Sequence, residues 1–257
     1  MKKKPLVSVI MNCYNGERYL KNSIQSVLNQ DYKNWELIFW DNKSQDGSKK
    51  IFNGFKDKRL KYYRAKKFTN LYAARNLAIK KAKGDILTFL DVDDLWLSEK
   101  LSKQVFFFEK NKKAELVYSN YFNLKNFFGF QSESIQFKKN LPFGFITDKL
   151  LKSYCIGWLT VAIKKKAMHK ISFNEKLDMV SDFDFIINFS LNKKIFSIQQ
   201  ALAKYRQHPN QLTRKKFFLQ AEQYLKWYQI AQTYIKFKEI KNISKFIDRI
   251  FFLEKII

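Results

Sequence analysis

Three aspartates stand within four positions, at Asp91, Asp93 and Asp94, directly after an apolar run in the stretch GDILTFLDVDDLW. Carboxylates this close repel one another unless a cation lies between them. Mg²⁺ and Mn²⁺ take one or two protein carboxylates and complete their shells with water and substrate phosphate oxygens. A divalent-cation site is therefore one hypothesis, although a lone triplet is weak evidence because aspartate also caps helices and Asp94 suits that position.

The elements that position these acids follow from the hydrophobic pattern. Strands are predicted at residues 6–11, 36–40, 60–64, 86–90 and 115–119, and helices at 19–28, 71–84 and 99–111, with Gly84 in the left-handed conformation that ends a helix. Strand–helix–strand units imply a parallel sheet, so the first half is predicted to be an α/β layered domain.

Ligands of open α/β sheets bind beyond the carboxyl ends of the strands. Asp41 and the three clustered aspartates all stand at such ends. No GxGxxG motif follows the first strand and no GxxxxGK[ST] motif occurs, so neither a Rossmann dinucleotide site nor a P-loop is indicated. Phosphates bound at this edge would need another partner, and a carboxylate-held cation is the simplest one.

The composition limits the function classes. The 257 residues include 49 basic and 23 acidic side chains, a net charge of +26, which favours nucleic acid, anionic lipid or phosphate-bearing small molecules. Two cysteines without CxxC spacing and two histidines argue against a disulfide scaffold or a zinc site. No apolar run approaches 18 residues and the first apolar segment reads as a strand, so we expect a cytoplasmic protein, with peripheral attachment to the inner membrane face as an option.

Four segments in order, VSVIMNCYN, DNKSQDGS, NLYAARN and TFLDVDD, resemble the motifs of family 2 glycosyltransferases of the GT-A fold. The resemblance spans residues 6–213 and implies a Rossmann-like mixed sheet flanked by helices. It implies a GT-A domain at 1–214, with a nucleotide-binding half at 1–120 and an acceptor half at 121–214. It further implies metal-dependent, inverting transfer from a nucleotide sugar, taken to be UDP-linked, to a glycan or lipid-linked saccharide in cell-envelope polysaccharide synthesis such as lipopolysaccharide or capsule.

The resemblance assigns the nucleotide-sugar donor to a set of residues shared between the strand ends and two later segments: Asn12, Cys13, Tyr14, Asn15, Glu17, Asp41, Asn42, Arg75, Asp91 and Arg206. In this reading Tyr14 flanks the base, Asp41 and Asn42 bond the base and ribose, and Arg75 approaches the diphosphate. Without the resemblance, Tyr14 and Asn15 read as an ordinary turn and Asp41 as a cap of residues 44–47.

The expected cofactor is Mn²⁺ or Mg²⁺. The resemblance implies that Asp93 ligates it, that Asp91 holds ribose or metal-bound water, and that Asp94 either supports the ligands or caps a helix. In YRQHPNQLT, Arg206 and His208 correspond to residues that close over the diphosphate or help to hold the metal.

An inverting displacement needs a base for the acceptor hydroxyl. Family members carry a Glu-Asp pair at the start of a helix, and MVSDFDFIINF makes Asp182 the candidate, with Ser181 where glutamate is common. Capping of the predicted helix 182–191 is the structural alternative. Asp184 is the second candidate for the base. Gly157, Trp158 and Asp184 stand where acceptor contacts are expected, although an isolated Trp is more often a core residue.

Residues 215–257 lie beyond the resemblance and are predicted to form a basic amphipathic helical tail. Either Trp227, Phe237 and Phe246 enter an anionic membrane surface, or the apolar stripe packs on the domain or on a second subunit. Two rival functions stay open: a basic protein that binds nucleic acid or another polyanion, for which no recognised reading motif is present, and a non-catalytic partner that keeps the fold. No nucleic-acid partner is expected, and a homo-oligomer is an option.

Overall fold

The computed structural model describes residues 4–127, 130–168, 171–209, 211, 217–235, 240 and 244–256. The strands are β1 Val7–Cys13, β2 Trp35–Asp41, β3 Leu60–Arg64, β4 Ile86–Phe89, β5 Leu95–Trp96, β6 Leu116–Phe127, β7 Phe130–Ile135, β8 Ala162–Lys164 and β9 Phe196–Gln207. The helices are α1 Glu17–Leu28, α2 Ser48–Asn53, α3 Leu71–Lys81, α4 Lys100–Lys110, α5 Thr147–Lys152, α6 Ser181–Asn192, α8 Phe217–Ala231 and α9 Ser244–Ile256, with the 3₁₀ turns η1 Trp158–Thr160 and η2 Lys165–Met168.

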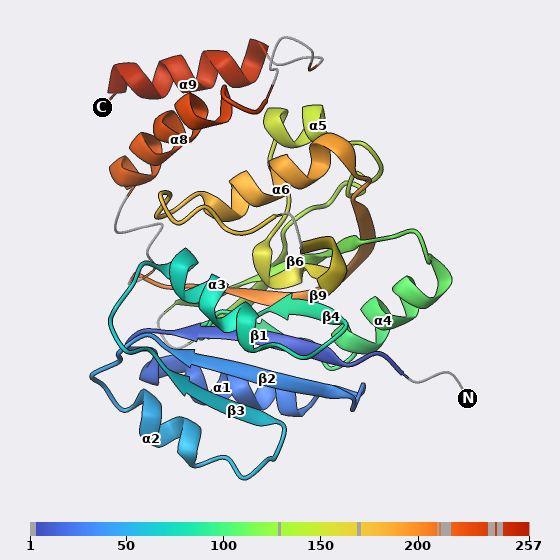
Figure 1. Cartoon of the computed structure of the whole chain (residues 1–257), viewed down its shortest axis with the longest axis vertical. Coiled ribbons are helices and arrows are strands. Elements are labelled where there is room, and N and C mark those ends of the chain that lie inside the picture. Colours follow the sequence, from blue (N-terminus) through green and yellow to red (C-terminus); the bar gives the residue numbers. More distant parts are fainter. Residues whose placement is uncertain are drawn as a thin grey trace.

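Within the described residues, nine strands form one mixed sheet in the order β3-β2-β1-β4-β8-β6-β9-β5, with β7 paired to β6 (Figure 1). The strands β3, β2, β1 and β4 are parallel, and the register pairs Val7 with both Trp35 and Ile86. β8 runs antiparallel to β4 and to β6. The predicted α/β fold with a mixed sheet is confirmed, and the carboxyl ends of β2, β1 and β4 meet at one edge.

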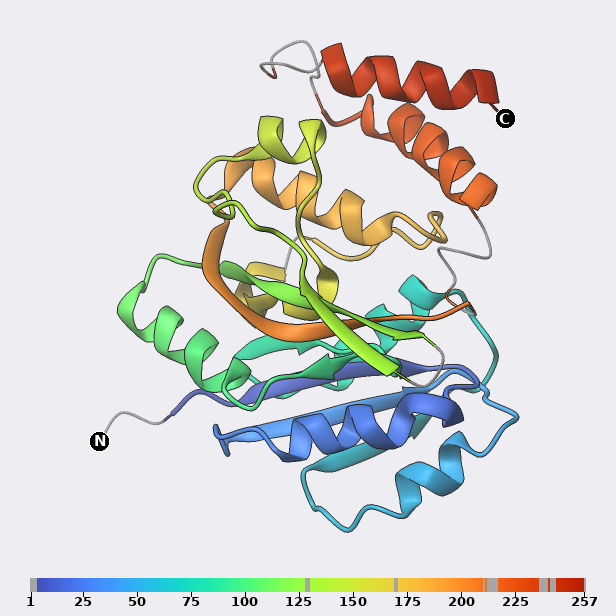
Figure 2. The same cartoon turned by 180° about the vertical axis from the view of Figure 1, so that it is seen from behind.

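Helices cover both faces of this sheet (Figures 1 and 2). On one face α1, α2 and α4 bury a core with β1 and β2. On the other face α3, α5 and α6 pack with the C-terminal helices α8 and α9 over a second, aromatic core. Each strand of the parallel part therefore has apolar neighbours above and below, as expected for near-continuous apolar runs such as VSVIM.

Gly84 departs from the prediction. α3 ends at Lys81, Ala82 is extended, and Gly84 does not have the left-handed conformation expected at a helix end. Its backbone N–H instead donates to Ser8 Oγ at 2.8 Å. A β-carbon at this position would lie 2.6 Å from both Ser8 N and Ser8 Oγ, so close backbone approach is the reason for glycine here.

Several elements were not predicted from the sequence. α2, β5 and the long strand β9 had no clear pattern, and the segment 123–170 turns out to contain β7, α5, η1, β8 and η2. β9 was missed because the residues of FSIQQALAKYRQ change between buried, half-exposed and exposed without the two-residue period of a strand.

The C-terminal segment packs on the domain through its described apolar residues. Trp227 and Phe246 are buried and belong to the same core as α3 and α6. Phe237 and Ile243 lie outside the described residues. Of the two alternatives for the tail, the described side chains therefore show the packed one. In the described part of the chain, no helix combines the length and apolar character needed to cross a bilayer.

Substituting Gly84 tests the close approach of the chain to Ser8. Gly84→Ala places a methyl group against the backbone of β1, and we expect a loss of about 1–3 kcal/mol in the free energy of unfolding. Urea denaturation of both proteins measures this. Gly54→Ala is the control, since its β-carbon would meet its nearest neighbour, a carbonyl oxygen, at 3.2 Å; equal stability of Gly84→Ala and wild type would contradict the packing argument.

Candidate functional site

A pocket of about 540 Å³ opens at the carboxyl ends of β1, β2 and β4. It collects residues from the strand ends, from the segment before α3, from the segment before α6 and from α8: Asn12, Cys13, Tyr14, Asn42, Phe68, Thr69, Asn70, Leu71, Ala74, Asp91, Val92, Asp93, Asp178, Met179 and Leu219. The edge of the sheet predicted to bind a ligand is thus hollowed, and a nucleoside is small enough to fit a pocket of this size.

An aromatic pair marks the mouth of the pocket. Tyr14 and Phe68 have ring centroids 4.7 Å apart and remain 51% and 57% exposed. Exposed rings at the mouth of a pocket offer a planar ligand a stacking surface. Phe68 was missed in the sequence because it stands alone in the basic loop RAKKFTN, and the only signal was an aromatic residue just before a helix.

Asn12 and Cys13 form part of the floor. The amide of Asn12 is buried, and neither its oxygen nor its nitrogen has a hydrogen-bond partner among the described residues. A buried amide without partners is costly, which makes this side chain a candidate for hydrogen bonds to a ligand. The Cys13 thiol lies 3.4 Å from Ser48 Oγ. Burial raises the pKa of this thiol above its ordinary value, so the thiol is uncharged at neutral pH.

Asp41 is buried and its carboxylate is occupied. Oδ1 accepts the Ser44 N–H at 2.7 Å, as in the capping alternative, while Oδ2 accepts the Tyr62 hydroxyl at 2.5 Å and lies 3.3 Å from Arg64. Burial and this carboxylate raise the pKa of Tyr62 to about 12. Asp41 is not among the residues that line the pocket. The next residue, Asn42, does line it while bonding the Thr69 backbone at 2.7 Å.

Asn15 and Glu17 hold the loop before α2 instead of lining the pocket. Asn15 adopts a φ of 52°, a conformation asparagine tolerates, and its Oδ1 accepts the Gln45 N–H at 2.8 Å. Glu17 Oε2 accepts the Gly47 N–H at 2.5 Å. These bonds fix the loop against the turn that carries Tyr14.

The acids after β4 each have a partner from a distant part of the chain. Asp91 Oδ1 pairs with Arg75 of α3 at 2.9 Å, and this carboxylate is 42% exposed at the pocket. Asp93 Oδ2 lies 3.0 Å from His208 Nε2. Burial raises the pKa of Asp93, with a further contribution from the charge of Asp91.

Asp94 turns away from the pocket into the protein. Its Oδ1 accepts the Arg206 backbone N–H at 2.9 Å, and Arg206 Nε donates to the Asp93 carbonyl at 2.9 Å. Burial and the neighbouring acids raise the pKa of Asp94 well above its ordinary value. Asp94 does not cap a helix, because α4 begins at Lys100 after Glu99; that alternative was wrong. Asp94 instead ties β9 to the acidic turn.

The carboxylates of Asp91 and Asp93 fit a hard cation. Asp91 and Asp93 both line the pocket, so a cation there would have two oxygen ligands from the chain. Among the described residues there is no group of three or more His, Cys, Asp and Glu side chains suited to a closed cage. An open pair is what Mg²⁺ or Mn²⁺ needs when phosphate and water complete the shell.

Asp182 is the second residue of α6, four residues after Asp178 in the pocket wall, and is not itself among the residues that line the pocket. Its Oδ1 accepts the Tyr72 hydroxyl at 3.1 Å and its own helix N–H from Phe183 at 2.8 Å. Burial raises the pKa of Asp182, while the positive charge of Arg75 opposes the rise. A carboxylate with a raised pKa is a stronger base than a free one. The buried Ser181 hydroxyl has no partner within the described chain.

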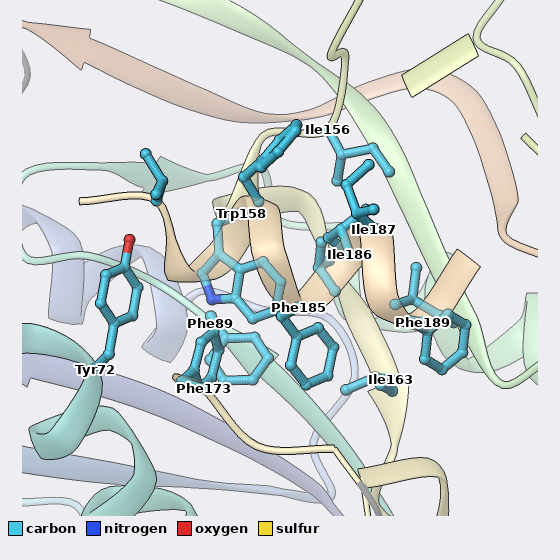
Figure 3. Packing of buried hydrophobic residues seen from close by; sticks show 14 of the residues in the cluster. Tyr72, Phe89, Ile156, Trp158, Ile163, Phe173, Phe185, Ile186, Ile187 and Phe189 are labelled. Carbon is cyan, nitrogen blue, oxygen red and sulfur yellow. The ribbon is translucent and has the colours of Figure 1, made fainter. Parts of the chain in front are cut away.

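Of the three acceptor candidates, Trp158 and Asp184 are buried and Gly157 is half-buried. Trp158 lies among Phe89, Phe173 and Phe185, with ring centroids 4.6, 5.1 and 5.5 Å away, as Figure 3 shows. Gly157 has Tyr121 against the face where a β-carbon would lie. Asp184 accepts a hydrogen bond from Trp227 of α8. None of the three lines the pocket, whereas Asp178, Met179 and Leu219 do and were not predicted.

Comparison with known proteins gives the family. The model of glycosyl transferase family 2 matches residues 8–196. The chain is 39% identical over 65% of its length to the Escherichia coli UDP-Glc:alpha-D-GlcNAc-diphosphoundecaprenol beta-1,3-glucosyltransferase WfgD, and spans 64% of that relative. It is 29% identical to the putative teichuronic acid biosynthesis glycosyltransferase TuaG of Bacillus subtilis, covering 93% of this chain and 90% of TuaG.

Solved structures agree on the fold. Staphylococcus aureus TarS in complex with UDP-GlcNAc superposes with a TM-score of 0.74 at 19% identity, over 93% of this chain and 69% of TarS. The mannosyltransferase PcManGT of Pyrobaculum calidifontis, solved with GDP-Man and Mn²⁺, gives 0.66 at 15% identity, over 98% of this chain and 70% of that one. The prediction made from the four motifs is confirmed: the chain belongs to glycosyl transferase family 2 and has the GT-A fold.

Proposed function

We propose that the chain transfers a sugar from a UDP-linked donor to a saccharide or lipid-linked saccharide during cell-envelope glycan synthesis, with inversion at the anomeric carbon. The observation that carries this proposal is the pocket at the sheet edge. It has an exposed aromatic pair at its mouth, an unpaired buried amide in its floor, and two carboxylates in its wall. These features match the base, the polar groups and the diphosphate of a nucleotide sugar.

The choice of donor and acceptor rests on the relatives. WfgD is named for a UDP-glucose donor and a diphosphoundecaprenol-linked acceptor, and TarS was solved with UDP-GlcNAc. The chain shares the family of the first and the fold of the second. UDP-glucose and UDP-GlcNAc are therefore the first donors to test, with a lipid-diphosphate saccharide as the acceptor.

Tyr14 and Phe68 would bind the base between or against their rings, while Asn12 and Asn42 offer amide groups to the base and ribose. Asp93 and Asp91, with His208 beside Asp93, would hold Mn²⁺ or Mg²⁺. When bound, such a cation would supply positive charge to the leaving diphosphate, in place of a general acid.

Asp182 is the proposed base. In the displacement, the acceptor oxygen forms its bond to the anomeric carbon while the bond from that carbon to the diphosphate breaks. The proton of the acceptor hydroxyl passes to the Asp182 carboxylate, and the electron pair leaves with the nucleotide diphosphate. The Tyr72 hydroxyl orients the Asp182 carboxylate. The positive charge of Arg75 stabilises the ionised form of Asp182 and also pairs with Asp91.

Replacing the proposed base separates chemistry from binding. Asp182→Asn keeps the size of the side chain but removes the base, so kcat should fall by about 10²–10⁴-fold while donor affinity changes little. Single-turnover assays with UDP-glucose or UDP-GlcNAc, together with calorimetry of donor binding, measure both quantities. Asp248→Asn on α9 is the matched control. Loss of donor binding in Asp182→Asn would make this carboxylate structural.

The aromatic pair predicts a stacking contribution to nucleotide binding. Phe68→Ala removes half of the pair, and we expect UDP to bind about 5–30-fold more weakly, in keeping with the loss of one aromatic contact. Phe130→Ala on β7, where the ring is 81% exposed, is the control for a surface Phe. Unchanged UDP affinity in Phe68→Ala would remove this residue from the donor site.

Metal dependence is tested on Asp93. Asp93→Asn should abolish the increase in UDP affinity produced by Mn²⁺ and reduce transfer to background, because an amide is a poor ligand for a hard cation. EDTA should have the same effect on the unmodified protein, reversed by excess Mn²⁺. Undiminished transfer in EDTA would contradict the metal assignment while leaving the glycosyltransferase assignment intact.

Salt-sensitive binding of any polyanion without donor turnover would instead favour the binding-protein alternative.

A further inference from the structure

α6 carries two aspartates that face different parts of the molecule. Asp182 and Asp184 are two residues apart, which is about 200° around a helix, so their side chains lie on opposite sides. Asp182 bonds Tyr72 near the pocket. Asp184 is 6% exposed and its Oδ1 accepts two hydrogen bonds, one from Trp227 Nε1 at 2.9 Å and one from the Tyr234 hydroxyl.

We propose that Asp184, Trp227 and Tyr234, together called the Asp184 latch, are positioning residues that hold the proposed base Asp182 in its working geometry. The proposal rests on the proposed function, because it concerns the same reaction. It makes the C-terminal helix α8 part of the transfer site, whereas the family match ends at residue 196.

The latch is supported by the contacts of Phe183, the residue directly after Asp182. The Phe183 ring packs edge-on against two rings of α8. Its centroid lies 4.7 Å from that of Trp227 and 5.3 Å from that of Tyr224. The fully buried Trp227 therefore contacts α6 through its ring as well as through its N–H. A shift of α8 cannot leave the first turn of α6 in place.

α8 also forms hydrogen bonds with the segment that leads into α6. Gln223 Oε1 accepts the Asp178 backbone N–H at 2.7 Å, and Lys226 Nζ donates to the Lys176 carbonyl at 2.7 Å. Asp178 and the following Met179 line the pocket, and so does Leu219 of α8 itself. The same helix thus contacts one wall of the pocket and the first turn of α6, which carries the proposed base Asp182.

The electrostatics suit a fixed anchor. Burial raises the pKa of Asp184, and the hydrogen bonds from Tyr234 and Trp227 oppose the rise by stabilising the carboxylate. A buried carboxylate bonded by two donors has few alternative arrangements, so it fixes the rotation of α6 about its axis. Displacements near 1 Å at a reacting group lower rates by about 10²-fold, which sets the scale of the effect.

The test removes hydrogen-bond donors from the latch while keeping an aromatic ring at positions 227 and 234. Trp227→Phe should lower kcat about 30–100-fold and Tyr234→Phe about 10-fold, with the dissociation constant of UDP in Mn²⁺ changed less than about twofold. Asp184→Asn retains the oxygen that both donors use and should keep turnover within about threefold, whereas Asp184→Ala should resemble Trp227→Phe. All rates are taken per folded molecule, well below the melting temperature.

Two matched substitutions control for the loss of an indole or a hydroxyl elsewhere. Trp35→Phe removes a buried Nε1–H that has no partner among the described residues, and Tyr32→Phe removes a hydroxyl that donates to Pro5 at 2.5 Å. Both lie at the opposite edge of the sheet and should leave kcat unchanged. Wild-type kcat in Trp227→Phe and Tyr234→Phe, or losses that vanish once corrected for the folded fraction, would overturn the latch.

Hydrogen–deuterium exchange separates failure of the latch from failure of the proposed function. In Trp227→Phe the amides of residues 176–184 should exchange at least tenfold faster than in the wild type, with no such change in Trp35→Phe. If the wild type transfers no sugar, the proposed function fails and the latch is judged on exchange alone. Unchanged protection of residues 176–184 in Trp227→Phe would then refute it.

Discussion

Three carboxylates at the end of β4 must be kept together although each repels the others, and the structure does this with partners from distant segments. Arg75 of α3 pairs with Asp91, His208 with Asp93, and the Arg206 backbone with Asp94. Each partner brings its own element to the edge of the sheet. The acidic turn therefore organises α3 and the end of β9 around the pocket, and loss of any one partner would leave a partly buried charge exposed to repulsion.

The three acids differ in burial, and their contacts differ accordingly. Asp94 points inward and ties β9 to the turn, so it is structural. Asp91 and Asp93 face the pocket, where a cation and a diphosphate would complete the charge balance. The protein's net charge of +26 belongs mostly to exposed lysines and does not by itself identify a partner, whereas a few buried groups define the chemistry.

The second half of the chain carries the proposed base, which the first half does not contain. α6 presents Asp182 beside Tyr72 of α3, so the proposed base is placed by elements more than 100 residues apart. α8 and α9 cover α6 with Trp227 and Phe246, which makes the basic C-terminal segment a packed layer of the same core. Lys226 of α8 is exposed while the neighbouring Trp227 is buried. Lysines beside an apolar stripe are a pattern that a membrane helix and a docked helix share in sequence.

The sequence by itself determined the family, the α/β class and the strand ends that carry the acids, because these depend on short motifs and on local periodicity. It also indicated which residues to consider, although the roles of individual side chains remain predictions. Phe68 and Met179 were overlooked, since an isolated apolar residue in a loop carries only a weak local signal.

Only the tertiary structure decided which of the candidates share a pocket. It placed Asp41 and Asp184 in buried hydrogen-bond networks, showed that Gly84 is needed for contact with Ser8 and not for a turn, and packed the tail on the domain. These outcomes depend on contacts between residues far apart in the chain. Such contacts are fixed by packing and charge pairing in three dimensions, which no local sequence pattern encodes.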